Sequence, residues 1–183
     1  MTTKTLAIGS LILAAFLACQ AVLLKDYISK DTREPAWDQA VHMEIALDYR
    51  QAIREGRWGD IFNLPPKPGM PPFPPLYHLA LTLAYDWSPS NPAGAALWLN
   101  FFYLVALCLS LFGIAWEYGL EYRAWVPAVA FACTPAVQAL CRTQLVDLAV
   151  AAWVAAAYWA YIRSERFARW PGDDACSILR PLP

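Results

Sequence analysis

Five isolated polar residues, predicted below to lie near a membrane, are the candidates for chemistry: Asp38, His42, His78, Arg142 and Asp147. A carboxylate or an imidazole held near a membrane surface can act as a general base or bind a metal, and an arginine can hold a phosphate. Asp38 and His42 are four residues apart, so they share one face if their segment is helical. Such a pair could bind a metal, although its more ordinary role is an exposed polar contact.

Asp147 lies one turn into an otherwise uncharged run that extends from Thr143 to Ile162. A carboxylate at the centre of a bilayer costs up to about 2.5–3.5 kcal/mol, so such residues usually face a bundle interior or a cavity. We therefore expect a functional role for Asp147. Arg142, five residues earlier, either extends to the membrane interface or pairs with Asp147.

Asp38 and His78 each have a structural interpretation as well as a functional one. Asp38 could serve only as the N-cap of a helix, where its carboxylate accepts hydrogen bonds from the first N–H groups. As a functional residue it would be a base or a metal ligand. His78 could be no more than a histidine at the membrane boundary.

The composition indicates that a membrane positions these residues. Hydrophobic residues make up 58% of the 183-residue chain and charged residues 16%, against roughly 45–50% and about 25% in an average globular protein. The net charge of −1 argues against a nucleic-acid-binding protein. The five cysteines show no CxxC spacing, so we expect neither a zinc site nor a disulfide framework.

Long runs without charge predict four membrane-spanning helices. A helix needs about 20 apolar residues to cross about 30 Å of hydrocarbon. The chain offers such runs at about residues 5–24, 94–116, 124–141 and 144–162. The first run could also be a cleaved signal peptide, but it is longer than the usual apolar core of one, so we interpret it as an uncleaved anchor.

The segment between the first two spans is predicted to be an external loop with its own helices. Fifteen of the charged residues lie between Lys25 and Lys67. An amphipathic pattern predicts a surface helix over about residues 38–55, and Gly56 is a typical stop for it. Seven prolines in residues 65–75 then predict a stiff, extended segment.

The apolar segment Leu76–Trp87 decides the topology. Its twelve residues would cover about 18 Å as a helix, which is too short to span, so we interpret it as an interfacial helix. The loop 25–92 and the turn Thr143–Asp147 then lie on the same side of the membrane, whereas a fifth span would separate them. The arginines of the C-terminal tail favour a cytoplasmic end.

The expected fold class is therefore an all-α, polytopic protein of the cell (inner) membrane with about four transmembrane helices. An external loop carries amphipathic juxtamembrane helices. The expected domains are a first transmembrane helix (1–24), the external loop (25–92), a three-helix membrane bundle (93–162) and a cytoplasmic tail (163–183).

The order of these features resembles the N-terminal module of GT-C-fold glycosyltransferases. These are polytopic enzymes that use polyprenyl-phosphate-linked sugars, such as protein O-mannosyltransferases and lipid A aminoarabinose transferases. The resemblance covers roughly residues 5–165 and rests on the order and spacing of short motifs. The matching residues are Trp37-Asp38-Gln39, Pro74-Pro75-Leu76-Tyr77-His78, and Thr134-Pro135 followed by Arg142-Thr143-Gln144-Leu145-Val146-Asp147.

The resemblance implies a membrane glycosyltransferase, or a truncated fragment of one. It would transfer a sugar from a lipid-linked, polyprenyl-phosphate donor to an acceptor hydroxyl at the external membrane face. Asp38 and Asp147 would be catalytic. In some members such aspartates join around a divalent metal, so the resemblance offers Mg²⁺ or Mn²⁺ at these two residues as the one cofactor. Arg142, His42 and His78 would bind the phosphate or the sugar of the donor.

Relatives of this kind continue through several more spans, whereas this chain ends soon after the fourth. We therefore expect little transferase activity without a C-terminal partner chain or a missing domain. Two other classes stay open: a non-catalytic membrane scaffold or subunit that keeps this module, and a small transporter that uses Asp147 as an ion site. A transporter should carry more ionisable residues within its spans.

Overall fold

The computed structural model describes residues 3–35, 37–63, 73 and 75–164, and all regular structure within them is helical. This confirms the all-α prediction. The elements are α1 (Thr3–Lys30), α2 (Asp38–Arg54), α3 (Asp60–Asn63), α4 (Pro75–Trp87), α5 (Pro92–Glu117), a 3-10 turn η1 (Glu121–Arg123), α6 (Trp125–Ala132), α7 (Pro135–Leu140) and α8 (Asp147–Arg163).

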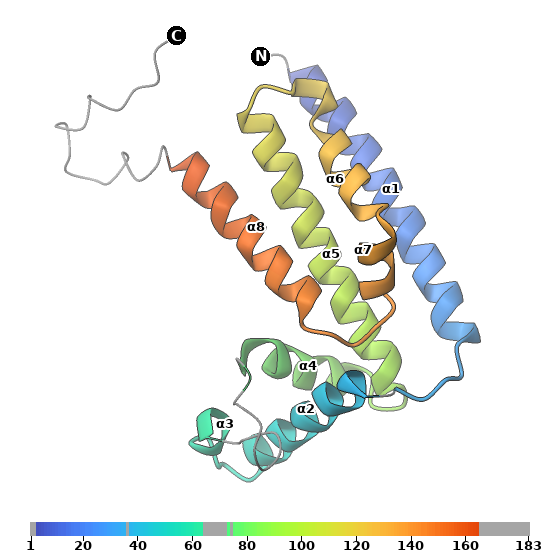
Figure 1. Ribbon diagram of the computed structural model, residues 1–183, viewed down its shortest axis with the longest axis vertical. Coiled ribbons are helices and arrows are strands. Elements are labelled where there is room, and N and C mark those ends of the chain that lie inside the picture. The colour runs from blue at the N-terminus through green and yellow to red at the C-terminus, as the bar shows by residue number, and fades with distance from the viewer. Residues whose placement is uncertain (1–2, 36, 64–72, 74, 165–183) are drawn as a thin grey trace, which may run out of the picture.

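The helices form a bundle with a platform across one end of it (Figure 1). In the bundle, α5 lies between α8 on one side and α1, α6 and α7 on the other. The platform consists of α2, α3 and α4 and lies where α1 ends and α5 begins. The start of α1 and the end of α8 lie at the opposite end of the bundle.

The core of the bundle is built around α5. Leu104 and Leu107 of α5 are almost fully buried, and so are Leu148 and Ala152 of the neighbouring α8. The two helices run parallel from the platform end (Figure 1). Their packing therefore holds the first residues of α8 close to the platform.

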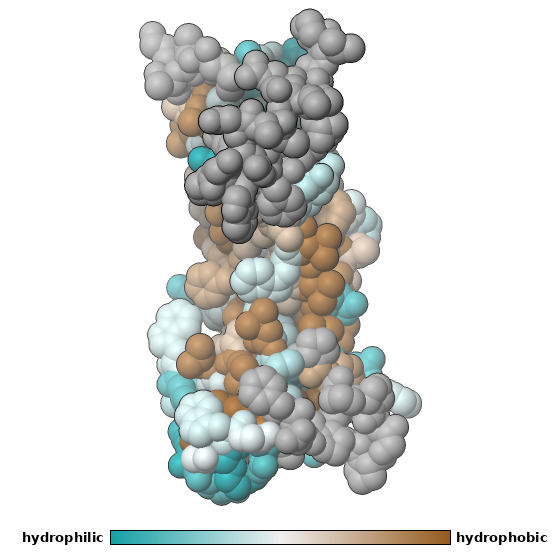
Figure 2. Space-filling view, turned by 90° about the vertical axis from the view of Figure 1, so that its left-hand side faces the viewer, coloured by the Kyte–Doolittle hydropathy of each residue, from teal (hydrophilic) through white to brown (hydrophobic). Residues whose placement is uncertain are grey.

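Two helices in the described part of the chain are long and apolar enough to span a membrane: α1, from Leu6 to Lys30, and α5. Figure 2 shows hydrophobic residues over the middle of the bundle and hydrophilic residues gathered at the platform end. α8, with 17 residues, measures about 25 Å. The structure thus carries two helices with the length and composition of a span, where the sequence predicts four.

The predicted third span, residues 124–141, is not one helix. It forms α6 and α7, which are separated by Cys133 and Thr134. Thr134 has φ −64° and ψ 142°, the extended conformation that a following proline favours. Pro135 also lacks the N–H that would continue the hydrogen bonds of α6. The absence of charge in residues 124–141 indicates that the segment is apolar, but it does not reveal the break between α6 and α7.

The two main platform helices form where the sequence predicts them. α2 ends at Arg54, and Gly56 follows with a φ of +73°, the left-handed conformation that glycine supplies after a helix. Asp86 of α4 accepts hydrogen bonds from Arg50 (2.6 Å) and Arg54 (3.2 Å) of α2. These ion pairs tie α2 and α4 side by side, so α4 belongs to the platform rather than to the bundle.

The sequence predicts that the loop 25–92 and the turn Thr143–Asp147 lie on the same side of a membrane, and this topology stays a prediction. The turn of residues 143–146, between α7 and α8, lies at the platform end of the bundle (Figure 1). Most of the proline-rich segment, residues 64–72 and 74, and the tail from residue 165 onward lie outside the described residues. The extended segment and the cytoplasmic tail therefore stay predictions.

Candidate functional site

His42 and His78 form a buried pair between the two main platform helices. Nδ1 of His42 lies 3.0 Å from Nε2 of His78, so one ring donates a hydrogen bond to the other. The two residues are only 5% and 0% exposed. Two histidines that the sequence places on separate segments are therefore partners. Their role in substrate binding stays a prediction, because here the facing nitrogens bind each other.

Aromatic rings enclose the pair. The centroids of Phe73, Tyr77 and Tyr49 lie 5.1–6.0 Å from one or both imidazole rings. Burial lowers the pKa of His42 below its ordinary 6.5, because an imidazolium loses hydration in this environment, while nearby carboxylates act in the opposite direction. The net lowering favours the neutral form of His42 at pH 7.

Asp38 is the first residue of α2 and not its N-cap. The N-cap position belongs to Trp37, which has a φ of 51° and is 91% exposed. No side-chain hydrogen bond caps α2, so the interpretation of Asp38 as an N-cap is wrong. Its exposed carboxylate instead lies at the positive end of the helix dipole.

Asp147 is the first residue of α8 and not a residue one turn inside a span. The helix starts later than the uncharged run does, because residues 143–146 form the preceding turn. The Asp147 side chain is exposed. Asp38 and Asp147 both raise the pKa of His42 through their charge. The charges of these two carboxylates therefore oppose the effect that burial has on the pKa of His42.

Asn100 holds the turn after α7 in place. This residue of α5 is fully buried, and its Nδ2 donates hydrogen bonds to the carbonyl oxygens of Leu140 (3.3 Å) and Thr143. Its Oδ1 accepts a hydrogen bond from the Tyr77 hydroxyl at 3.4 Å. One amide side chain thus joins the bundle, the turn and the platform.

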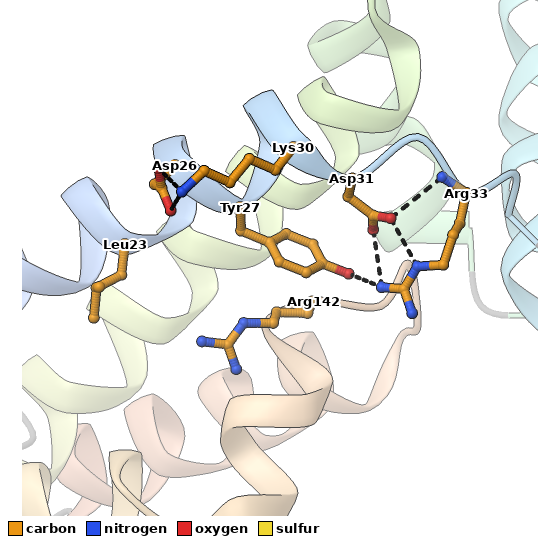
Figure 3. Close-up of a pocket in the computed structure, with 7 residues that line it drawn as sticks. All are labelled: Leu23, Asp26, Tyr27, Lys30, Asp31, Arg33 and Arg142. Atoms are coloured by element: carbon orange, nitrogen blue, oxygen red, sulfur yellow. Dashed lines mark hydrogen bonds and ion pairs between the residues drawn. The ribbon is translucent and has the colours of Figure 1, made fainter.

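Arg142 lies in a pocket at the end of α1 (Figure 3). Its guanidinium carbon is 5.6 Å from the centroid of the Tyr27 ring, and its Nη1 donates a hydrogen bond to the carbonyl oxygen of Gln138 at 3.3 Å. The cavity measures about 360 Å³. Its lining residues are Leu23, Asp26, Tyr27, Lys30, Asp31, Arg33 and Arg142.

The acidic residues of the pocket pair with other cations. Asp26 pairs with Lys30 and Asp31 with Arg33, each at 2.7 Å. In the described part of the chain no ion pair joins Arg142 to a carboxylate, so the pairing with Asp147 that the sequence allowed does not form. A guanidinium without a carboxylate partner suits an oxyanion in the cavity.

A narrow apolar crevice adjoins this pocket. Leu23 and Arg142 line both spaces, and the crevice lies where α1, α5 and α7 meet. Its other lining residues are Gln20, Leu24, Phe101, Leu104, Gln138 and Cys141. The crevice has space for little more than one water molecule, so the pocket beside Arg142 is the larger of the two spaces.

A divalent metal at Asp38 and Asp147 lacks a third protein ligand in this structure. Across the residues described, no group of three or more His, Cys, Asp or Glu side chains is placed to hold a metal ion. Two exposed carboxylates would need oxygens of a substrate or water to complete a Mg²⁺ or Mn²⁺ shell. The metal at these residues stays a prediction.

Sequence reasoning missed Asn100, Tyr27 and Arg33. Asn100 carried a signal, since an amide in an apolar span needs hydrogen-bond partners once it is buried. Tyr27 and Arg33 lie just after the uncharged run of the first span. Nothing in their spacing shows that they share a pocket with Arg142, because that contact depends on how α1 packs in the bundle.

Comparisons with protein-family models, with curated proteins and with solved structures find no match for this chain.

Proposed function

We propose that this chain is a membrane glycosyltransferase, or part of one, that transfers a sugar from a polyprenyl-phosphate donor to an acceptor hydroxyl. In this proposal α1, α5, the α6–α7 segment and α8 cross the cell (inner) membrane, and the platform lies at its external face. One observation carries the proposal: α2 of the platform begins at Asp38, α8 begins at Asp147, and the start of α8 lies at the platform end of the bundle (Figure 1). Two exposed carboxylates far apart in sequence therefore lie at the same end of the molecule.

Asp38 is the proposed general base. It takes the proton of the acceptor hydroxyl while the hydroxyl oxygen attacks the anomeric carbon, and the phosphate leaves with the electron pair of the broken C–O bond. Asp147 orients the sugar. Asp38 and Asp147 are also the residues that would hold a divalent metal, which would supply positive charge for the leaving phosphate. Both carboxylates are exposed, which suits an acceptor that arrives from water.

The pocket at the end of α1 supports the lipid-linked donor. Arg142 offers N–H donors to a phosphate, and the exposed apolar side chain of Leu23 borders the same pocket. The charged residues Asp26 and Lys30 mark the level at which α1 leaves its uncharged run. A phosphate on a membrane lipid lies at this level.

Binding of a polyprenyl phosphate tests the donor independently of catalysis. The purified chain in lipid nanodiscs is titrated with the phosphate, and Arg142→Gln is expected to weaken binding about tenfold. A hydrogen bond to a charged group contributes about 1.5–3 kcal/mol, and the lower end of this range corresponds to a loss of about tenfold.

Arg163→Gln is the matched control for this titration. Arg163 also lies over an aromatic ring, 5.9 Å from the centroid of Trp159, but at the opposite end of the bundle (Figure 1). It should bind the phosphate as the unchanged chain does. Equal weakening by both substitutions, or equal binding of the uncharged polyprenol, would refute the proposed donor site.

A non-catalytic membrane subunit is the second candidate, and the outer face of α8 favours it. Val150, Trp153, Val154 and Tyr158 share this face and are 48–64% exposed. Such an apolar surface is available to lipid or to a partner helix. If the chain is only a subunit, Asp38→Asn should preserve its cellular role, whereas polar substitutions on this face should abolish it.

A further inference from the structure

The exposed face of α4 is a stripe of apolar side chains. Leu76, Leu83 and Trp87 are 55–73% exposed. Steps of seven and four residues separate them, so they lie on one side of the helix. The single carboxylate of α4, Asp86, forms ion pairs with two arginines of α2. The stripe itself is therefore an uncharged, apolar surface.

The helix α2 packs on the opposite side of α4. His78 and Tyr85 follow Leu76 by two and nine residues, which places both about half a turn away from the stripe. Both are buried, and His78 shares a hydrogen bond with His42 of α2 at 3.0 Å. The exposed side chains of α2 are mostly polar and include Glu44, Asp48, Gln51 and Arg54. The two helices thus form a layer that is polar on the α2 side and apolar on the α4 side.

Contacts with α5 fix the level of α4 along the bundle. The Tyr77 hydroxyl donates a hydrogen bond to Oδ1 of Asn100 at 3.4 Å, and the ring centroids of Tyr77 and Tyr103 are 6.2 Å apart. A helix needs about 20 residues to cross the hydrocarbon of a bilayer. Counted back from Glu117, the last residue of α5, this length ends near Leu97. The start of α4 therefore lies level with the boundary of the hydrocarbon and not beyond it.

We propose that the stripe of α4 is a lipid-contact surface, which seats the platform in the leaflet on its own side of the membrane and keeps α2 in water. Lipid fits this surface because the stripe is uncharged and level with the apolar surface of α5, where Phe102 is also exposed. Trp87 suits the same level, since indole rings gather at membrane interfaces. The sequence predicts both helices at the membrane surface, whereas this inference gives the lipid contact to α4 and excludes α2 from it.

Quenching of tryptophan fluorescence by brominated lipid tests the contact directly. The full chain is placed in phosphatidylcholine nanodiscs, with or without bromine on the acyl chains. The fluorescence of Trp87 is the difference between the unchanged chain and Trp87→Phe. Most of this difference should disappear in brominated discs, because bromine quenches an indole only at short range. A Trp87 fluorescence that is equal in both kinds of disc would overturn the inference.

Trp58→Phe is the matched control for this measurement. Trp58 is also an exposed tryptophan of the platform end, but it follows α2 rather than α4. Its fluorescence should be the same in both kinds of disc. Equal quenching of Trp58 and Trp87 would contradict a contact made by α4 alone. A second copy of the chain on the stripe would shield Trp87 from bromine and would also overturn the inference.

Trp153→Phe separates failure of the inference from failure of the proposed function. The lipid contact rests on the membrane-crossing bundle of that proposal, but it does not need sugar transfer. Trp153 is exposed on α8, so bromine quenches it if the bundle crosses the bilayer. Quenching of Trp153 without quenching of Trp87 would overturn the lipid contact alone. No quenching of either residue would refute the membrane-crossing bundle as well.

A charge within the stripe gives a second readout. Leu83→Glu puts a carboxylate where we expect lipid, so it should reduce the quenching of Trp87, because a charge is costly in hydrocarbon. Leu47→Glu is the control, since Leu47 is also exposed but lies on α2. Neither substitution changes a buried side chain. Equal effects of the two substitutions, or no effect of Leu83→Glu, would contradict the inference.

Discussion

Burial of a single ionisable side chain makes the stability of this protein depend on pH. His42 has a lowered pKa in the folded chain, so between that value and 6.5 the unfolded chain binds more protons than the folded one. Stability is therefore fully present above pH 6.5 and is lost as the pH falls below it. We predict a lower unfolding temperature at pH 5.5 than at pH 7.5, measured by thermal unfolding in detergent. His42→Gln should reduce this difference, and an unchanged difference would contradict the assignment.

Loss of the buried Asn100 amide should destabilise the protein more than the lost side-chain volume alone would. Asn100→Ala leaves two carbonyl oxygens and a hydroxyl without their partner, at a cost of about 3 kcal/mol. Asn91→Ala is the comparison, because Asn91 only caps α5 through Gly94, a contact worth about 1 kcal/mol. Denaturant unfolding measures both. Equal losses would show that Asn100 does not fix the turn after α7.

Some residues of the site could be predicted from the sequence around them, whereas others could not. Asp38 could be selected because it begins the predicted amphipathic helix, and Asp147 because it is a charge in an otherwise uncharged run. The start of α2 was predicted, whereas α8 begins three residues later than the predicted span of residues 144–162. The contact of His42 with His78 could not be predicted, because it forms only when α2 packs on α4.

At the scale of elements, α2 and α4 were predictable because their causes are local. An amphipathic pattern and Gly56 define α2, and prolines precede α4. The break between α6 and α7 also has a local cause, Pro135, which a search for uncharged runs ignores. The packing of α4 on α2, in contrast, brings together residues far apart in the chain, such as Arg50 and Asp86.

The packing of α5 on α8 offers a test at this scale. A Cβ added to Gly113 would overlap the ring of Trp159, so Gly113→Ala should destabilise the chain by about 1–3 kcal/mol. Gly59→Ala is the control, because nothing lies within 4 Å of its added Cβ. Denaturant unfolding of both variants measures the difference. Equal stabilities of the two variants would contradict the close approach of these helices.

Trp159→Leu should partly rescue Gly113→Ala, because the smaller side chain leaves room for the new methyl group. A double-mutant cycle separates this coupling from the separate effect of each substitution. An interaction free energy of zero would show that Gly113 and Trp159 are not in contact.

At the scale of the whole molecule, the proposal assigns the platform end to the external side of a membrane. The turn before α8 and the platform lie together, and both described ends of the bundle lie opposite to them (Figure 1). We predict that a reporter fused at Asn91, between α4 and α5, lies outside the cell, and that one fused at Pro183 lies in the cytoplasm. A cytoplasmic reporter at Asn91 would mean that α4 crosses the membrane and that the platform is not external.

The central claim is that Asp38 is the base of a sugar transfer at this platform. The direct measurement is transfer of labelled sugar from polyprenyl phosphate in membranes of cells that lack the gene and receive it back as a variant. Asp38→Asn should lower transfer at least about a hundredfold, as loss of a general base does. The variant should still fold, since Asp38 makes no capping hydrogen bond and loss of its charge at the helix start costs only about 0.3–1 kcal/mol. Asp48→Asn, on the same helix, should retain full transfer, and a fully active Asp38→Asn chain would contradict the account.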